Sequence, residues 1–248
     1  MNNDIDEFNN IIKTASISNI DQVYIYNQEN IDFRTVKIIG TQKRNYIIID
    51  KGAILKNSII DFRSENAIVY IKSDGVRANF LLGYGSCIYI DESTSFTNTA
   101  NILAAEGHDI YIGKDCMFAE NINITNSDGH PIFDNSGMRI NGGGDIIIGN
   151  HVWVGRNTDI LKNTVLDSGC IIGSRSVVTK SIPYASIAVG APAQIKKRDV
   201  LFSKETTVRH ERLFFNEDKA YHPKKLINNE KSFLTYIKDF IYKNNGIF

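Results

Sequence analysis

A six-residue repeat constrains the fold of this chain more than any other feature of its sequence. From Ile148 onward, consecutive blocks read IGNHVW, VGRNTD, ILKNTV, LDSGCI, IGSRSV and VTKSIP. Each block begins with an aliphatic residue, and most place a small or acidic residue after it and another small residue three positions further on. A fixed internal period indicates a repeat architecture, in which each unit packs on its neighbours along the chain.

The length of the repeat predicts the shape of each unit. Six residues provide one short strand and one tight turn, so three blocks close one triangular coil of about 18 residues. Stacked coils place the aliphatic residues of every third block against one another in the interior. We therefore expect Ile148 to stack with Leu166 and Leu166 with Tyr184, while Val154 stacks with Ile172. The sequence predicts an all-β protein, a parallel β-helix.

Two interruptions in the phase of the repeat predict bulges. Ile112 and Ile124 continue the pattern upstream. The spacing from Ile102 to Ile112 is ten residues, four more than one block, and the surplus contains the segment EGHD. The spacing from Ile124 to Ile148 is 24 residues, a surplus of 18. That surplus must leave the prism as an extruded loop at about residues 126–143, and a loop that interrupts a repeat array often carries function.

The repeat weakens toward both ends of the chain, which predicts three regions. We expect an N-terminal segment at residues 1–35, a β-helix at residues 36–195 with irregular first coils, and a C-terminal tail at residues 196–248.

Both end regions contain apolar residues at helical spacing. In residues 4–14 this pattern predicts a short amphipathic helix. Near the C-terminus, the segment FLTYIKDFIY places Phe233, Ile237 and Phe240 on one helical face. We expect this second helix to pack on the first or on a neighbouring chain. Binding to a membrane surface is the alternative, but the segment is short and not strongly basic.

Composition excludes several classes of protein. The chain has 28 basic and 28 acidic residues, so its net charge does not suggest a nucleic-acid partner. No apolar run approaches the roughly 20 residues that span a bilayer, and the polar start MNNDIDEFNN does not resemble a signal peptide. The three cysteines fit neither a disulfide framework nor a zinc pattern. We expect a cytoplasmic protein in which Cys116 and Cys170 are packing residues.

His130 is the best candidate for chemistry in the extruded loop. It lies in the segment SDGHPIFD, where the preceding glycine and following proline favour an exposed, non-helical backbone. Histidine has an ordinary pKa of about 6.5, so a neutral fraction can accept a proton from an alcohol near neutral pH. Asp128, Asp134 or the loop backbone could orient its ring, and the sequence does not choose among them. The alternative is a solvated surface histidine.

Two other histidines are weaker candidates. His151 occupies a corner of its block, and we expect it to be solvated. His108 lies in the four-residue bulge, where a secondary binding role is conceivable. A zinc site formed by His108, His130 and His151 is disfavoured, because zinc enzymes of this shape take two ligands from one loop whereas these residues are about one coil apart. We expect no metal.

The run from IGNHVWVG to GAPAQIKK, together with NSDGHPIFD, resembles the hexapeptide-repeat O-acetyltransferases. Within that family it is most similar to the bacterial sialic-acid and polysialic-acid capsule O-acetyltransferases. The resemblance covers about residues 90–197. It implies a left-handed β-helix, a homotrimer, and acetyl-coenzyme A bound as acetyl donor in the cleft between adjacent prisms.

The resemblance also implies roles for particular residues. His130 would be the general base, and Trp153 would line the site near the thioester, where its indole N–H could stabilise an oxyanion; the alternative for Trp153 is a surface aromatic residue. The expected coenzyme-binding residues are Trp153, Gly155, Ser174, Thr179, Lys180, Lys196 and Lys197. The expected acceptor-binding residues are Asp128, Arg139 and Arg156. A solvated face is the alternative for the lysines, and ordinary solvated corners for the arginines.

These features favour an acetyl-coenzyme A-dependent O-acetyltransferase. The expected acceptor is a sugar hydroxyl, with sialic acid or another unit of a capsule or surface polysaccharide as the sharper prediction. One alternative is an N-acyltransferase acting on a nucleotide-linked amino sugar. Another is a non-catalytic β-helix that serves as a scaffold.

Overall fold

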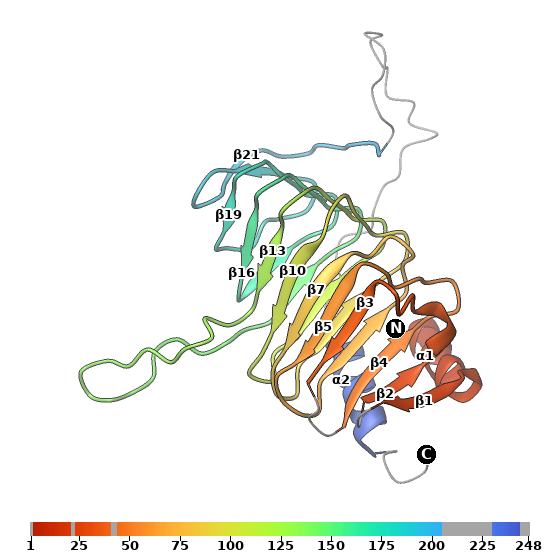
Figure 1. Cartoon of the computed structure of the whole chain (residues 1–248). Coiled ribbons are helices and arrows are strands. Elements are labelled where there is room, and N and C mark those ends of the chain that lie inside the picture. The colour runs from red at the N-terminus through yellow and green to blue at the C-terminus, as the bar shows by residue number, and fades with distance from the viewer. Residues whose placement is uncertain (1, 21–22, 41–43, 205–229, 244–248) are drawn as a thin grey trace.

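The body of the protein is a parallel β-helix in which the chain winds through three sheets in turn. The computed structural model describes residues 2–20, 23–40, 44–204 and 230–243. Each sheet forms one face of the prism (Figure 1). The predicted β-helix with short flanking helices is therefore confirmed.

The elements are as follows. The eight-stranded sheet has the order β1 (Ile17–Ile20), β2 (Val23–Tyr26), β4 (Asn45–Ile49), β6 (Ile68–Ile71), β8 (Cys87–Ile90), β11 (Ile110–Ile112), β14 (Ile146–Ile148) and β17 (Thr164–Leu166). The seven-stranded sheet has the order β19 (Val177–Val178), β16 (Asp159–Leu161), β13 (Asn123–Thr125), β10 (Ala100–Ala104), β7 (Ala78–Leu82), β5 (Ser58–Phe62) and β3 (Val36–Ile39). The six-stranded sheet has the order β21 (Gln194–Lys197), β20 (Ile187–Val189), β18 (Ile171–Ile172), β15 (Trp153–Val154), β12 (Met117–Phe118) and β9 (Ser95–Phe96). The helices of the described residues are α1 (Asn2–Thr14), α2 (Glu230–Lys243) and the short 3-10 helix η1 (Gln28–Asn30).

The first residue of each six-residue block fills the interior of the prism. Ile148, Val154 and Leu166 are fully buried, and Ile172 is nearly so. Ile148 pairs with Leu166, and Val154 pairs with Ile172, in parallel register. These two predicted stacks are confirmed. The interior is a single hydrophobic column because every coil contributes its aliphatic residues at the same positions.

The fifth residue of each block is also buried, beside the turn. Cys116 and Cys170 occupy this position and are fully buried, as predicted for packing residues. Burial raises the pKa of both thiols to about 12. The thiols therefore stay protonated near neutral pH and behave as small apolar groups.

The predicted stacking of Leu166 with Tyr184 is wrong. Leu166 instead pairs with Ile182, 16 positions further along the chain. Ile182 is aliphatic and almost completely buried, so it fills the interior position before the chain reaches Tyr184. The Sγ atom of Cys170 lies 3.0 Å from the carbonyl oxygen of Pro183, which holds this shorter turn against the coil below. The last coil is therefore two residues shorter than the repeat.

The fourth residue of each block makes the corner. These residues have a positive φ, at Asp115, Asn121, His151, Asn157, Asn163, Gly169 and Arg175. Asp, Asn and Gly adopt this left-handed conformation most readily. The small polar residues of the repeat are therefore turn residues, in keeping with the prediction of one strand and one tight turn per block.

Strand pairing measures the two interruptions. Ile102 pairs with Ile124, 22 positions away, and Ile124 pairs with Ile160, 36 positions away. Ile160 pairs with Val178 at the regular spacing of 18. The surplus residues predicted around EGHD and in the extruded loop are both confirmed. Both surpluses leave the prism at the corner between the seven-stranded and eight-stranded sheets, where Figure 1 shows the loop projecting far from the body.

The two helices form a second layer on the outer face of the eight-stranded sheet. Phe8 of α1 is fully buried, with its ring centroid 5.8 Å from Tyr70 and 5.6 Å from Phe240 of α2. Phe233 and Ile237 are buried in the same layer. Both predicted helices and the packing of the second on the first are confirmed. Neither has the length and apolar character that crossing a bilayer requires.

Coil stacking gives a testable requirement for glycine at position 149. A Cβ atom there would lie 2.7 Å from both the backbone nitrogen and Oγ of Ser168 in the next coil. We expect Gly149→Ala to lower the free energy of unfolding by about 1–3 kcal/mol, measured by urea denaturation, because the backbone atoms must move apart. Gly52→Ala is the control, since its Cβ would meet nothing within 4 Å. Equal stability of the two variants would contradict the close contact between coils.

Candidate active site

The extruded loop is a hairpin closed at its tip by an aspartate. The amide of Ile140 donates to the carbonyl of Ile132 (2.9 Å), and Phe133 pairs with Arg139 in an antiparallel bridge. At the tip, Oδ1 of Asp134 accepts hydrogen bonds from the amides of Ser136 and Met138 (both 2.9 Å). The carboxylate of Asp134 is therefore occupied in holding the turn.

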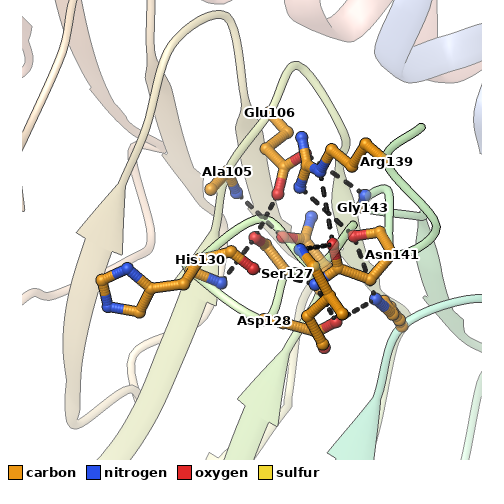
Figure 2. A network of polar contacts seen from close by, with 12 residues as sticks. Ala105, Glu106, Ser127, Asp128, His130, Arg139, Asn141 and Gly143 are labelled. Atoms are coloured by element: carbon orange, nitrogen blue, oxygen red, sulfur yellow. Dashed lines mark hydrogen bonds and ion pairs between the residues drawn. The ribbon is translucent and has the colours of Figure 1, made fainter. Parts of the chain in front are cut away.

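Asn141 organises the base of the loop, on both sides of His130. Its Nδ2 donates to the carbonyl of His130 and to Oδ2 of Asp128, both at 2.8 Å, and its Oδ1 accepts from the amide of Ile132 (2.6 Å). Asn141 is almost completely buried. One amide side chain thus holds the backbone of His130 and Ile132 and the carboxylate of Asp128, in the network of Figure 2.

Two ion pairs tie this base to the coils beneath. Arg139 lies 2.8 Å from Glu106, which also accepts a hydrogen bond from Ser127 Oγ (2.5 Å). Together, the hydrogen bonds of Arg139 and Ser127 hold the pKa of Glu106 at about 2. On the other side, Lys162 donates to Asp128 at 2.5 Å and lowers the pKa of that carboxyl. Both carboxylates are therefore charged and paired near neutral pH.

The ring of His130 points away from this network (Figure 2). Within the described residues, no hydrogen bond or ion pair reaches its ring nitrogens. Asp128 is engaged by Lys162 and Asn141, and Asp134 by the hairpin turn. Only the backbone carbonyl of His130 is held. The structure therefore fixes the position of His130 and leaves its imidazole open to solvent or to another molecule.

Trp153 lies on a different face of the prism. It belongs to β15 in the six-stranded sheet, in an outward row between Met117 and Ile171. It is 39% exposed. The loop leaves the prism at the opposite corner, between the other two sheets, and no described contact joins it to Trp153. Within one chain, His130 and Trp153 are not brought together.

The expected coenzyme-binding residues divide between two places. Lys196 and Lys197 are exposed on β21, in the same sheet as Trp153. Gly155 follows β15, where a Cβ atom would lie 2.6 Å from the amide nitrogen of exposed Ser174. Contact between coils is therefore a sufficient reason for glycine at this position.

The other candidates lie at corners. Thr179 and Lys180 follow β19 and are exposed at the corner from which the loop departs. Arg156 is exposed at the corner between the six-stranded and seven-stranded sheets. Asp128 and Arg139, expected to bind the acceptor, belong to the network at the base of the loop, where they pair with Lys162 and Glu106.

The prediction that His151 is solvated is wrong. Its side chain is 4% exposed, with Nδ1 2.6 Å from Oδ2 of Asp115 and Nε2 3.0 Å from the carbonyl oxygen of Phe202. The repeat identified the corner but gave no sign that the chain beyond β21 returns to cover it. His108, in the bulge, lies 3.1 Å from Asp145. Among the described residues, no group of three or more His, Cys, Asp or Glu side chains could hold a metal ion.

Sequence reasoning missed four residues of the loop base: Glu106, Ser127, Asn141 and Lys162. The clue for Glu106 was its place in the other interruption, since surplus residues at one corner of stacked coils become neighbours. The remaining three had no signal in the repeat, because polar residues are common in loops of any kind.

Comparison with known proteins agrees with this architecture. The family pattern described as bacterial transferase hexapeptide (six repeats) matches residues 145–180. A polysialic acid O-acetyltransferase of Escherichia coli O1:K1 / APEC is 39% identical over 70 residues, which cover 28% of this chain and 23% of that protein. The match thus spans about a quarter of that relative's length.

Two solved structures extend the similarity over most of the chain. The polysialic acid O-acetyltransferase OatWY aligns with a TM-score of 0.62 and 29% identity, covering 77% of this chain and 92% of that one. The polySia-specific acetyltransferase NeuO aligns with a TM-score of 0.58 and 28% identity, covering 72% and 86%. This chain therefore carries the hexapeptide repeat of bacterial transferases and shares the fold of these acetyltransferases.

The loop network predicts a local effect of substituting Asn141. In Asn141→Ala, the amide of Ile132 loses its acceptor, a hydrogen bond worth about 1 kcal/mol. We expect hydrogen exchange of the Ile132 amide, followed by mass spectrometry of a peptide that contains it, to become roughly fivefold faster while the melting temperature of the β-helix stays unchanged. Asn135→Ala, at the exposed tip, is the control. Unchanged exchange in Asn141→Ala would show that other contacts hold the loop.

Proposed function

We propose that this protein is an acetyl-coenzyme A-dependent O-acetyltransferase that acetylates a sugar hydroxyl. Its acceptor is sialic acid or another unit of a capsule or surface polysaccharide. The observation that supports this most strongly is the extruded loop, which presents the open imidazole of His130 from a rigid base. The similarity to two polysialic acid acetyltransferases supports the acceptor class. Because the donor is a cytoplasmic metabolite, the proposal places the enzyme in the cytoplasm.

The proposed mechanism is direct transfer. His130 accepts the proton of the acceptor hydroxyl as that oxygen attacks the thioester carbonyl. The indole N–H of Trp153 donates to the oxyanion that forms on the carbonyl oxygen. When the intermediate collapses, the carbon–sulfur bond breaks and the leaving thiolate takes the proton from His130. The products are the acetyl ester and free coenzyme A, and no metal takes part.

The distribution of charge supports roles for the remaining candidates. Lys196, Lys197 and Lys180 are exposed cations that can pair with coenzyme phosphates. Gly155, Ser174 and Thr179 would leave room for the pantetheine arm. Arg156 is exposed and available to an anionic acceptor. Asp128 and Arg139 are proposed to bind the acceptor from the base of the loop, where their ion pairs with Lys162 and Glu106 hold them.

The site is proposed to form between copies of the chain in a homotrimer. Trp153 lies on the six-stranded sheet, whereas His130 lies in the loop that leaves the opposite corner, so a neighbouring protomer is needed to bring the two together. The hairpin also exposes apolar side chains that a neighbour can cover. These are Ile132 (54% exposed), Phe133 (57%), Met138 (68%) and Ile140 (64%). Exposed apolar patches of this kind often mark protein contacts.

Removing the proposed base should abolish turnover. We expect His130→Ala to lower kcat by about 10²–10⁴-fold, because the alcohol must then lose its proton without a base. Release of free thiol from acetyl-coenzyme A measures the rate, with oligosialic acid and a panel of sugars and amino sugars as acceptors. Asn135→Ala, in the same loop, is the control and should keep wild-type turnover. An active His130→Ala enzyme would refute the base, and acetylation of amino groups alone would favour an N-acyltransferase.

A shared site also predicts complementation between inactive variants. If His130 of one protomer works with Trp153 of the next, mixed trimers of His130→Ala and Trp153→Ala subunits regain intact sites. Random mixing restores about one site in four, so we expect roughly a quarter of wild-type activity after co-expression. Each variant alone stays inactive. Absence of recovery in mixed trimers, verified by two affinity tags, would mean that both residues act within one chain or not at all.

A further inference from the structure

The chain beyond β21 returns along the prism to the face that carries Trp153. The amide of Val200 donates to the carbonyl of Ala185 (3.0 Å), in the last coil. Further on, Nζ of Lys204 lies 3.1 Å from the carbonyl oxygen of Ser93, which belongs to a much earlier coil. The segment therefore crosses several coils. We call residues 200–204 the return segment.

The return segment packs an aromatic ring between His151 and Trp153. The ring of Phe202 is stacked on the imidazole of His151, with centroids 4.0 Å apart and planes 12° from parallel. Its centroid is 5.8 Å from that of Trp153, at an interplanar angle of 44°. Contacts at these distances are typical of favourable aromatic pairs. Phe202 is therefore a neighbour of the indole proposed to meet the thioester.

A polar clamp holds Phe202 in this place. Asp115 contacts His151 through Oδ2 (2.6 Å) and Lys204 through Oδ1 (2.9 Å). The opposite ring nitrogen of His151 faces the carbonyl oxygen of Phe202 at 3.0 Å. His151 is almost completely buried. The clamp thus joins two successive coils, through Asp115 and His151, to Phe202 and Lys204 of the return segment. Because His151 is buried and both of its ring nitrogens have partners, it has little freedom to move.

We propose that Phe202 is a positioning residue of the acetyl-donor site, which it serves by fixing the indole of Trp153. The clamp formed by Asp115, His151 and Lys204 holds Phe202 for this purpose. The inference rests on the proposed function and adds the return segment to the donor site. Without Phe202, the indole would lie on an open strand of two residues, where several rotamers are accessible and the N–H has no fixed direction.

The sole tryptophan of the chain reports on this contact directly. In Phe202→Ala, we expect the emission of Trp153 to shift to longer wavelength, because water replaces the ring. We expect the KM for acetyl-coenzyme A to rise about fivefold, the size of effect that a lost aromatic contact produces, with the KM for the acceptor unchanged. Phe202→Tyr keeps the ring and should restore both values.

Two further variants separate the clamp from general damage to the fold. His151→Asn keeps a residue that tolerates the positive φ of this corner. It should reproduce the changes of Phe202→Ala, and the double variant should be no worse than either single one, because both act through one contact. Leu201→Ala is the control, since that side chain is 40% exposed and takes no part in the clamp.

The dissociation constant of coenzyme A, measured by quenching of Trp153 fluorescence, keeps the test independent of turnover. It should rise in Phe202→Ala and His151→Asn but not in Leu201→Ala. If the wild-type protein acetylated no acceptor, the proposed function would fail while this measurement still decided the role of Phe202. An unshifted emission in Phe202→Ala, or a shift with no change in coenzyme affinity, would overturn the inference.

Discussion

Hydrogen bonding between successive coils is the interaction on which the rest of the molecule depends. The amide of Trp153 donates to the carbonyl of Cys170 in the next coil, and the amide of Met117 donates to Val152 in the same way (both 2.9 Å). Buried backbone groups must be paired, so a coil cannot gain residues within its strands. Extra residues are forced out at a corner. The EGHD bulge and the extruded loop leave at the same corner in successive coils, and Glu106 can therefore pair with Arg139.

The need to pair polar groups also explains the contrast between the base of the extruded loop and the ring of His130. At the loop base, every charge has a partner, since a partly buried charge without one is unfavourable. The ring of His130, two residues beyond Asp128 in the chain, has no partner among the described residues. The charged groups at the base of the loop thus have partners, and within the described part of the chain the imidazole of His130 does not. This arrangement suits the binding of a second molecule by that imidazole. On the six-stranded sheet, the return segment plays the corresponding supporting role for Trp153.

Much of this could be predicted because the repeat is local. Periodicity identified the β-helix, the buried aliphatic column, the turn positions and the length of the loop, and it singled out His130. It could not identify the covering of His151 by Phe202, because that residue lies 51 positions further along, in a segment without the repeat. The stack of Leu166 with Tyr184 was mistaken for a related reason. Ile182 competes for the same interior position, and packing rather than phase selects between them.

The sequence by itself therefore determined most of the architecture, since six-residue spacing predicts coils of 18 residues with a buried aliphatic column and places the surplus residues of EGHD and of the extruded loop outside them. Tertiary structure decided which polar groups meet. Asn141 reaches both sides of His130, Glu106 pairs with Arg139 across two interruptions, and Asp115 joins His151 to Lys204. Side-chain hydrogen bonds of this kind link residues brought together only by coiling. Their partners depend on distances of a few ångströms in three dimensions, which no one-dimensional period encodes.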